Sequence, residues 1–222
     1  MKGLAANLAK VRERVQGALD RSGMPARTVT LVAVTKKVPL KTALQLAELG
    51  IEDFGENRLP DALERLEPLR KLGLKPHFIG HLQTNKVTKV VGFFDVIHSI
   101  DSVRLLDAVA LRAEALGRVQ EIFLQVNVSG EASKEGVDPE ALGPLLERAR
   151  SQPSLLVLGL MTLAPEGASE TRLREVFGGL RELARSFGLA GLSMGMSSDF
   201  EVAIEEGATH VRVGGALFGN LA

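Results

Sequence analysis

Eight short apolar segments follow one another along this chain of 222 residues, and stretches with helical periodicity fill most of the gaps between them. Strands that alternate with helices form parallel sheets, and eight of them in one uninterrupted run predict a closed (β/α)8 barrel, the TIM barrel. We therefore expect the α/β class and one barrel domain over residues 1–222. The predicted strands lie near residues 30–36, 51–55, 77–80, 96–100, 121–128, 155–162, 192–194 and 210–213.

The helices predicted between these strands cover residues 41–49, 57–72, 102–116, 139–151, 170–187 and 198–206, with a short helix near 85–91. An extra N-terminal helix, of the kind that often caps such a barrel, precedes the first strand and ends near Gly23. The competing fold is an open, doubly wound sheet. It loses its usual nucleotide signature here, because no GxGxxG follows the first strand and no Walker motif occurs.

Charge and composition exclude several classes of function. The 27 acidic and 27 basic residues balance, so nothing in the charge favours nucleic acid or an anionic membrane as a partner. The absence of cysteine removes disulfides, thiolate metal sites and cysteine nucleophiles. No apolar stretch is long enough to span a bilayer, and the N-terminus reads as an amphipathic helix rather than a signal peptide. We expect a cytoplasmic protein.

Lys36 is the first candidate for chemistry. It closes the apolar run of residues 31–35, and the carboxyl ends of barrel strands are where such enzymes keep their reactive groups. A partly desolvated lysine can lose its proton and attack an aldehyde to form an imine. A strand-end lysine that simply reaches solvent is the alternative.

The last two strands supply groups that suit an anion. Ser197 precedes a predicted helix, where it can act both as N-cap and as a phosphate ligand. Gly214 and Gly215 follow the last strand directly, and their bare backbone amides can approach a phosphate closely. A plain glycine turn into a final helix is the alternative for these two residues.

Arg212 completes the candidate site. Strand alternation places it on the inward side with Gly214, and a buried charge requires a partner such as a ligand nitrogen or a phosphate. A lysine for the aldehyde, a cradle for the phosphate and an arginine for the pyridine nitrogen are the parts of a site for pyridoxal 5'-phosphate (PLP). An arginine would leave that nitrogen unprotonated and weaken the ring as an electron sink.

In the segments that carry these residues, the chain resembles the pyridoxal phosphate homeostasis family (YggS/PROSC type), which shares the barrel of the alanine racemase N-terminal domain. The matching segments run in order along nearly the whole chain. They are residues 33–36 (AVTK), 54–57 (FGEN), 77–86 (HFIGHLQTNK), 125–127 (QVN), 133–136 (SKEG), 159–161 (GLM), 192–199 (LSMGMSSD) and 211–214 (VRVG).

The resemblance implies that Lys36 carries PLP as a Schiff base and that Asn57 lines the pocket. It also implies phosphate contacts from Ser197 and from the amides around Gly214 and Gly215, with Arg212 at the ring nitrogen. Met194, within the LSMGMSSD segment, joins the implied cofactor-binding residues. Members of the family are thought to buffer or deliver PLP. The implied partners are PLP itself and PLP-dependent apo-enzymes as recipients, and we expect a monomer without a catalytic residue.

The chain departs from the family pattern in three places. The usual Ser-Lys-Thr-Lys-Pro is replaced by Thr35-Lys36-Lys37-Val38-Pro39, so the second lysine is displaced by one position. Lys37 is a rival for the imine, but alternation puts it on the face opposite to Lys36. Arg58 stands where tyrosine usually follows the FGEN segment, and the sequence ends without the usual arginine-containing tail.

Two enzyme classes are the alternatives. An amino-acid racemase needs an acid or base on each face of its substrate, and alanine racemases use a tyrosine that this chain lacks. Lys36 could serve one face, and His81 is the best substitute on the other. A metalloenzyme is suggested by the spacing of His77 and His81, but these residues span a strand and a loop rather than one helical face. We expect no metal site.

Overall fold

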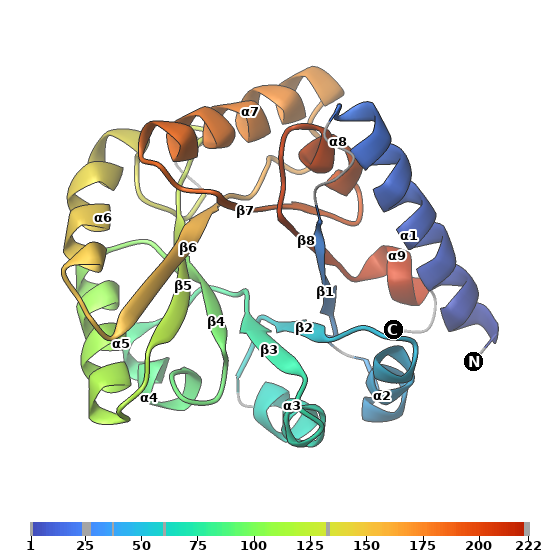
Figure 1. Ribbon diagram of the computed structural model, residues 1–222, viewed down its shortest axis with the longest axis horizontal. Helices are drawn as coiled ribbons and strands as arrows, with labels where there is room; N and C mark the ends of the chain where they lie inside the picture. Colours follow the sequence, from blue (N-terminus) through green and yellow to red (C-terminus); the bar gives the residue numbers. More distant parts are fainter. Residues whose placement is uncertain (1, 24–27, 37, 60, 132–133, 220–222) are drawn as a thin grey trace.

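A computed structural model of the chain describes residues 2–23, 28–36, 38–59, 61–131 and 134–219. Its eight strands pair in parallel in sequence order, and the last pairs with the first, which confirms the predicted (β/α)8 barrel (Figure 1). The strands are β1 (Thr30–Val34), β2 (Asp53–Glu56), β3 (Lys75–Phe78), β4 (Val96–Ile100), β5 (Gln120–Gln125), β6 (Leu155–Met161), β7 (Gly191–Met196) and β8 (His210–Val213).

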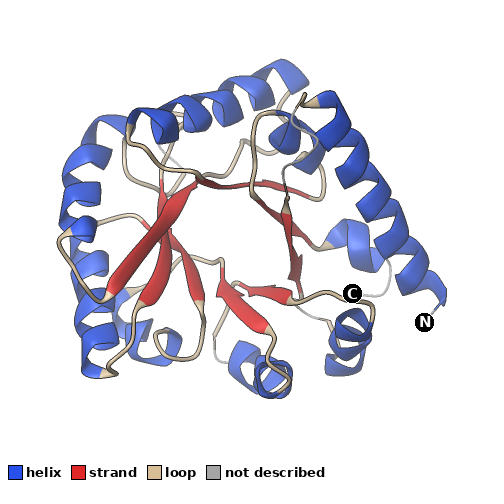
Figure 2. Cartoon of the chain, in the orientation of Figure 1, coloured by secondary structure: helices blue, strands red, loops and turns tan. Residues whose placement is uncertain are grey.

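The helices form an outer ring around the strands (Figure 2). Those between strands are α2 (Leu40–Glu48), α3 (Asp61–Lys71), α4 (Val87–Val90), α5 (Val103–Ala115), α6 (Leu142–Arg150), α7 (Glu170–Ser186) and α8 (Phe200–Glu205). The 3-10 helices η1 (Thr84–Lys86) and η2 (Pro139–Ala141) precede α4 and α6, and α9 (Gly215–Phe218) follows the last strand. No helix in the described part of the chain is long and apolar enough to cross a membrane.

The predicted N-terminal helix is present as α1 (Lys2–Arg21), and it lies in this outer ring rather than across a barrel end. It packs along α8 and α9, which are too short to cover β7 and β8 by themselves (Figure 1). Two ion pairs fix the contact: Arg14 reaches Glu201 at 2.6 Å, and Arg21 reaches Glu205 at 2.6 Å. The helix ends as predicted, with Gly23 in the left-handed conformation at φ 71°.

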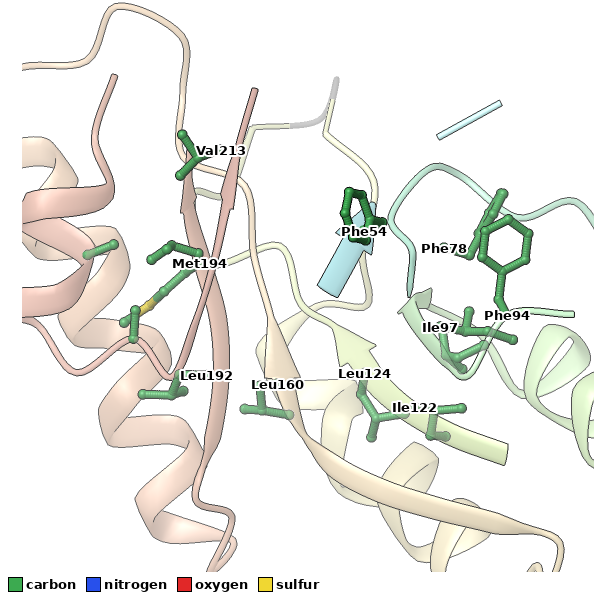
Figure 3. Close-up of a cluster of buried hydrophobic side chains, with 14 of the residues drawn as sticks. Phe54, Phe78, Phe94, Ile97, Ile122, Leu124, Leu160, Leu192, Met194 and Val213 are labelled. Atoms are coloured by element: carbon green, nitrogen blue, oxygen red, sulfur yellow. The ribbon is translucent and has the colours of Figure 1, made fainter. Parts of the chain in front are cut away.

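Alternation along each strand divides the core into two layers. Outward-facing side chains pack under the helices, and Figure 3 shows part of this outer layer, including Phe54, Ile97, Leu160 and Met194. The inward-facing positions hold a smaller apolar cluster, formed by Val96, Phe123 and Met161, together with an unusual share of polar side chains. The interior of the barrel is therefore available for a polar network.

The structure differs from the sequence prediction mainly at the carboxyl ends of the strands, where several strands are shorter than expected. β1 ends at Val34, so Lys36 lies in the turn that follows. α3 begins at Asp61 instead of residue 57, because a residue that precedes a proline disfavours the helical conformation and position 60 is a proline. The longer loop leaves Asn57 at the mouth of the barrel.

Candidate functional site

The ends of three neighbouring strands bring the candidate residues together. β1 pairs with β2 on one side and with β8 on the other. Lys36, Asn57 and Gly214 therefore lie just beyond the carboxyl ends of adjacent strands, on the face where barrel enzymes carry their sites. Lys36 is exposed in its turn. Lys37, the rival lysine, lies outside the described residues.

A buried hydrogen bond ties the turn that carries Lys36 to the end of β2. The Thr35 hydroxyl donates to Oε1 of Glu56 at 2.9 Å, and the Thr35 amide donates to the Gly55 carbonyl at 3.1 Å. Glu56 is fully buried and Thr35 is 2% exposed. These bonds fix the turn that carries Lys36 to the end of β2, a role of Thr35 and Glu56 that the sequence motif did not reveal.

Asn57 offers an unused acceptor at the mouth of the barrel. Its Oδ1 atom is buried and has no hydrogen-bond partner among the described residues. The backbone of Asn57 is held close to the next loop, since a Cβ at Gly80 would lie 2.2 Å from the Asn57 carbonyl oxygen. A buried polar atom without a partner is costly, and this one is suited to a ligand.

Ser197 and the glycine loop after β8 form a small cradle. The Ser197 Oγ accepts hydrogen bonds from the amides of Gly214 at 3.1 Å and Ala216 at 3.2 Å. With both bonds accepted, the hydroxyl proton remains available to an incoming anion. A Cβ at Gly215 would lie 3.7 Å from this oxygen, so the missing side chain keeps the cradle open.

The sequence predicts Ser197 as the N-cap of the following helix, and this prediction is wrong. The N-cap of α8 is Asp199, whose Oδ1 accepts the Met196 amide at 2.5 Å. Burial raises the pKa of Asp199, and the hydrogen bond from Met196 and the charge of Arg212 oppose that shift. The tight turn requires glycine at position 195, because its φ is 92° and a Cβ added there would lie only 2.6 Å from the Ala203 side chain. Ser197 is therefore turned toward the glycine loop.

Arg212 lies inside the barrel, as alternation predicts, and is 3% exposed. Its Nη1 donates to the Ser193 hydroxyl at 2.6 Å, and its Nη2 donates to the Thr162 carbonyl at 3.0 Å. Burial lowers the pKa of Arg212 to about 10, opposed by the nearby Asp199 carboxylate. The guanidinium thus remains charged at neutral pH and is fixed by two protein partners.

The Met194 side chain points away from this mouth. It is fully buried in the outer hydrophobic layer, beside Leu192 and Val213 in the view of Figure 3. The inward position belongs to Ser193, one residue earlier. Any contact of Met194 with a ligand would come from its main chain.

The loop after β5 is built by the polar residues at the end of that strand. Asn127 Nδ2 donates to the Glu131 carbonyl at 2.9 Å, and its Oδ1 accepts the Ser129 hydroxyl at 2.9 Å. Gln125 Nε2 donates to the Glu135 carbonyl at 3.2 Å. Their contacts are within the loop, so these two residues shape the rim.

His81 lies on the rim and not beside His77. Its Nδ1 is 3.1 Å from Oε1 of Glu135, and both side chains are 47% exposed. His77 belongs to β3 and is 1% exposed inside the barrel. Within the described ranges, no three histidine, aspartate or glutamate side chains are grouped so that they could hold a metal ion.

Known proteins are similar to this chain in sequence and in fold. Residues 4–222 match the family of the alanine racemase N-terminal domain. The pyridoxal phosphate homeostasis protein of Aquifex aeolicus is 44% identical over 96% of each chain. The protein of the same name from Pseudomonas aeruginosa is 41% identical over 99% of this chain and 96% of its own.

A solved structure of similar sequence matches the barrel. PipY of Synechococcus elongatus PCC7942, described with PLP bound, superposes with a TM-score of 0.86 at 34% identity. The match covers 97% of this chain and all of the other. The chain therefore belongs to the family of the alanine racemase N-terminal domain, among the relatives known as pyridoxal phosphate homeostasis proteins.

Proposed function

We propose that this protein binds PLP as a Schiff base on Lys36 and serves in PLP homeostasis, as a non-catalytic reservoir and carrier. The observation that carries the proposal is the convergence of three groups at one mouth of the barrel. Lys36 supplies an amine, Ser197 and the glycine loop supply an anion cradle, and Arg212 supplies a buried cation. Each matches a different part of the cofactor.

The cradle fits a phosphate group. Ser197 keeps a hydroxyl proton to donate, and Gly215 presents backbone without a side chain in the way. Amides and hydroxyls around a glycine loop are the donors that barrels of this type use for phosphate after their last two strands. Ser197, Gly214 and Gly215 are thus proposed as the phosphate ligands.

The interior groups fit the pyridine ring. Arg212 donates hydrogen bonds but does not give up its proton, so it would hold the ring nitrogen as an acceptor. Asn57 contributes the buried Oδ1 atom that has no partner among the described residues, and this atom suits a polar substituent of the ring. Bound PLP would supply an aldehyde, which condenses with the Lys36 amine to a C=N bond and releases one water.

The relatives support the cofactor and the role. The name of the Aquifex aeolicus relative states pyridoxal phosphate homeostasis, and the PipY structure was described with PLP bound. The chain has neither tyrosine nor cysteine, so the tyrosine base of alanine racemases has no counterpart here. We place the protein in the cytoplasm as a monomer, with PLP-dependent apo-enzymes as recipients of the cofactor.

A spectral titration tests the binding site. PLP added to the wild-type protein should produce a long-wavelength imine band that saturates at one equivalent. The Lys36→Arg variant keeps the charge but loses the amine nucleophile, so the band should be absent. Lys86→Arg, on the same rim, is the matched control and should behave as wild type. A saturable band that survives Lys36→Arg would refute the assignment.

A transfer assay tests the role in homeostasis. The loaded protein is mixed with a PLP-dependent apo-enzyme, in the presence of a phosphatase that destroys free PLP. Delivery would be supported if the apo-enzyme recovers activity faster with the loaded protein than with the same amount of free PLP, with the phosphatase present in both reactions. Recovery that equals the control with free PLP alone would contradict a carrier role and leave only storage.

A further inference from the structure

A continuous chain of hydrogen bonds runs through the barrel interior below Arg212. Arg212 Nη1 lies 2.6 Å from Ser193 Oγ, which lies 2.7 Å from His98 Nδ1. His98 Nε2 lies 2.9 Å from His77 Nδ1, and His77 Nε2 lies 2.7 Å from Asp53 Oδ1. The four residues above Asp53 are at most 3% exposed, whereas the Asp53 side chain is 23% exposed.

This chain of hydrogen bonds crosses the barrel from one mouth to the other. Its members come from β8, β7, β4, β3 and β2 in turn. Asp53 is the first residue of β2 and lines a pocket of about 390 Å³ between α1 and the amino-terminal ends of β1 and β2, beside Arg12 and Thr30. A side-chain path thus links the candidate site to a carboxylate on the opposite face.

The two ends of the network set its direction: an arginine can only donate, and the Asp53 carboxylate can only accept. Ser193 Oγ accepts from Arg212 and can donate its own proton to Nδ1 of His98. A neutral His98 then carries its proton on Nε2 and donates to His77 Nδ1. His77 in turn donates from Nε2 to the Asp53 carboxylate. All four contacts are satisfied in this arrangement.

The opposite arrangement fails at its far end. With protons on Nδ1 of both histidines, the bare Nε2 of His77 would face the Asp53 carboxylate, two acceptors 2.7 Å apart. Neutral His98 agrees with its surroundings, because burial, the largest cause, lowers its pKa well below 6.5. The positive charges of Arg212 and Lys75 act in the same direction.

Other titratable groups border this network. Lys75 pairs with Glu121 at 2.7 Å between Nζ and Oε2. His210 projects into the same interior and is half-buried, with a pKa lowered to about 4, chiefly by burial. Its Nδ1 contacts the Thr209 hydroxyl at 2.9 Å and takes no part in the chain. His210 is therefore a natural control for substitutions in the chain.

We propose that Ser193, His98 and His77 are positioning residues for Arg212, held in one orientation by the Asp53 carboxylate at the far end. The proposal rests on the proposed function, in which Arg212 faces the ring nitrogen of PLP. A chain of bonds that all point from cation to anion polarises each member, and it strengthens Ser193 as an acceptor. The guanidinium is thereby fixed as a donor toward the ring nitrogen.

The first test needs no cofactor. The protein contains four histidines, so nitrogen-15 correlation spectra of the imidazoles can be assigned by substitution. His98 should appear at neutral pH as the neutral tautomer protonated on Nε2, with Nδ1 of His77 as the acceptor of that proton. In Ser193→Ala the Nδ1 signal of His98 should move toward that of a free acceptor, while His210 stays unchanged. A proton on Nδ1 of His98 in the wild type would overturn the proposal.

The second test uses PLP as the probe. Ser193→Ala should weaken PLP binding about 10-fold, the lower end expected for a lost hydrogen bond to a charged group, and shift the imine absorption maximum. Ser193→Thr keeps the hydroxyl and should restore both. His210→Gln changes an inward-facing residue that takes no part in this hydrogen-bond network. It should lower thermal stability without altering the spectrum or the affinity.

The outcomes separate the two claims. A wild-type imine band with unchanged affinity and spectrum in Ser193→Ala would refute the positioning role and leave the proposed function intact. The absence of any band in the wild type would remove the proposed function, and the positioning role with it. In that case the histidine tautomers would still report the direction of the chain independently.

Discussion

Gly215→Ala should separate the stability of the protein from its affinity for phosphate. The added Cβ would lie 3.7 Å from Oγ and 3.9 Å from Cβ of Ser197, which is ordinary van der Waals contact. Gly215 is also the first residue of α9, where alanine is favoured over glycine by about 0.5–1 kcal/mol at most. The free energy of unfolding should therefore stay constant or rise slightly.

The same methyl group fills the space beside the Ser197 hydroxyl, where a phosphate oxygen would lie. Loss of one charge-assisted hydrogen bond costs about 1.5–3 kcal/mol, so the PLP dissociation constant should rise by roughly 10-fold or more. Binding is followed by the imine absorbance, with PLP and with pyridoxal, which lacks the phosphate. Only PLP should lose affinity, and the advantage of PLP over pyridoxal should shrink.

The control for Gly215→Ala is Gly143→Ala. Gly143 lies in the first turn of α6, where the new Cβ would meet only the Phe187 ring at 3.8 Å. This variant should gain similar stability with unchanged PLP affinity. Equal PLP binding by Gly215→Ala and wild type would show that the cradle after β8 does not hold the phosphate.

Three further predictions follow from the site and the interior. Asn57→Ala should weaken PLP binding with little change in the urea midpoint of the free protein, because its Oδ1 has no partner to lose; a large loss of stability would contradict this. Gly195→Ala should lower the free energy of unfolding by roughly 1–3 kcal/mol, through positive φ and a 2.6 Å approach to Ala203; an unchanged urea midpoint would refute it. Since folding depresses the pKa of His210 to about 4 and that of His98 well below 6.5, their stabilisation is complete above pH 6.5 and is lost toward pH 4. The free energy of unfolding, measured in urea, should fall by about 1.4 kcal/mol per pH unit for each residue over this range, and His210→Phe should remove half of that slope.

The barrel could be predicted from the sequence because parallel strands bury both faces. Each strand therefore appears as a short apolar run, and the intervening helices show their own periodicity. Lys36, Ser197 and Arg212 stand out for the same reason, as polar residues at or beyond the ends of such runs. Their neighbourhood follows from the closed strand order alone.

The partners of these residues could not be predicted, because they depend on contacts between distant strands. Nothing near Arg212 in the sequence points to Ser193 or to the Thr162 carbonyl. His98 lies within the apolar strand β4, where the sequence alone does not show which polar groups it faces inside the barrel. The contacts of this residue therefore required the three-dimensional structure.

Local ambiguity explains the wrong N-cap. Ser197, Ser198 and Asp199 are consecutive, and each is a residue type that caps helices well. The bend at Gly195 decides among them by turning Ser197 toward the glycine loop and leaving Asp199 at the start of α8. A similar one-residue difference separates inward Ser193 from Met194, whose side chain lies in the outer layer.

The site of covalent attachment tests the central claim most directly. The protein is loaded with one equivalent of PLP, reduced with borohydride and digested, and the modified peptide is identified by mass spectrometry. Our account predicts a single pyridoxyl label on Lys36. A label on Lys37, or one spread over surface lysines such as Lys86, would contradict it.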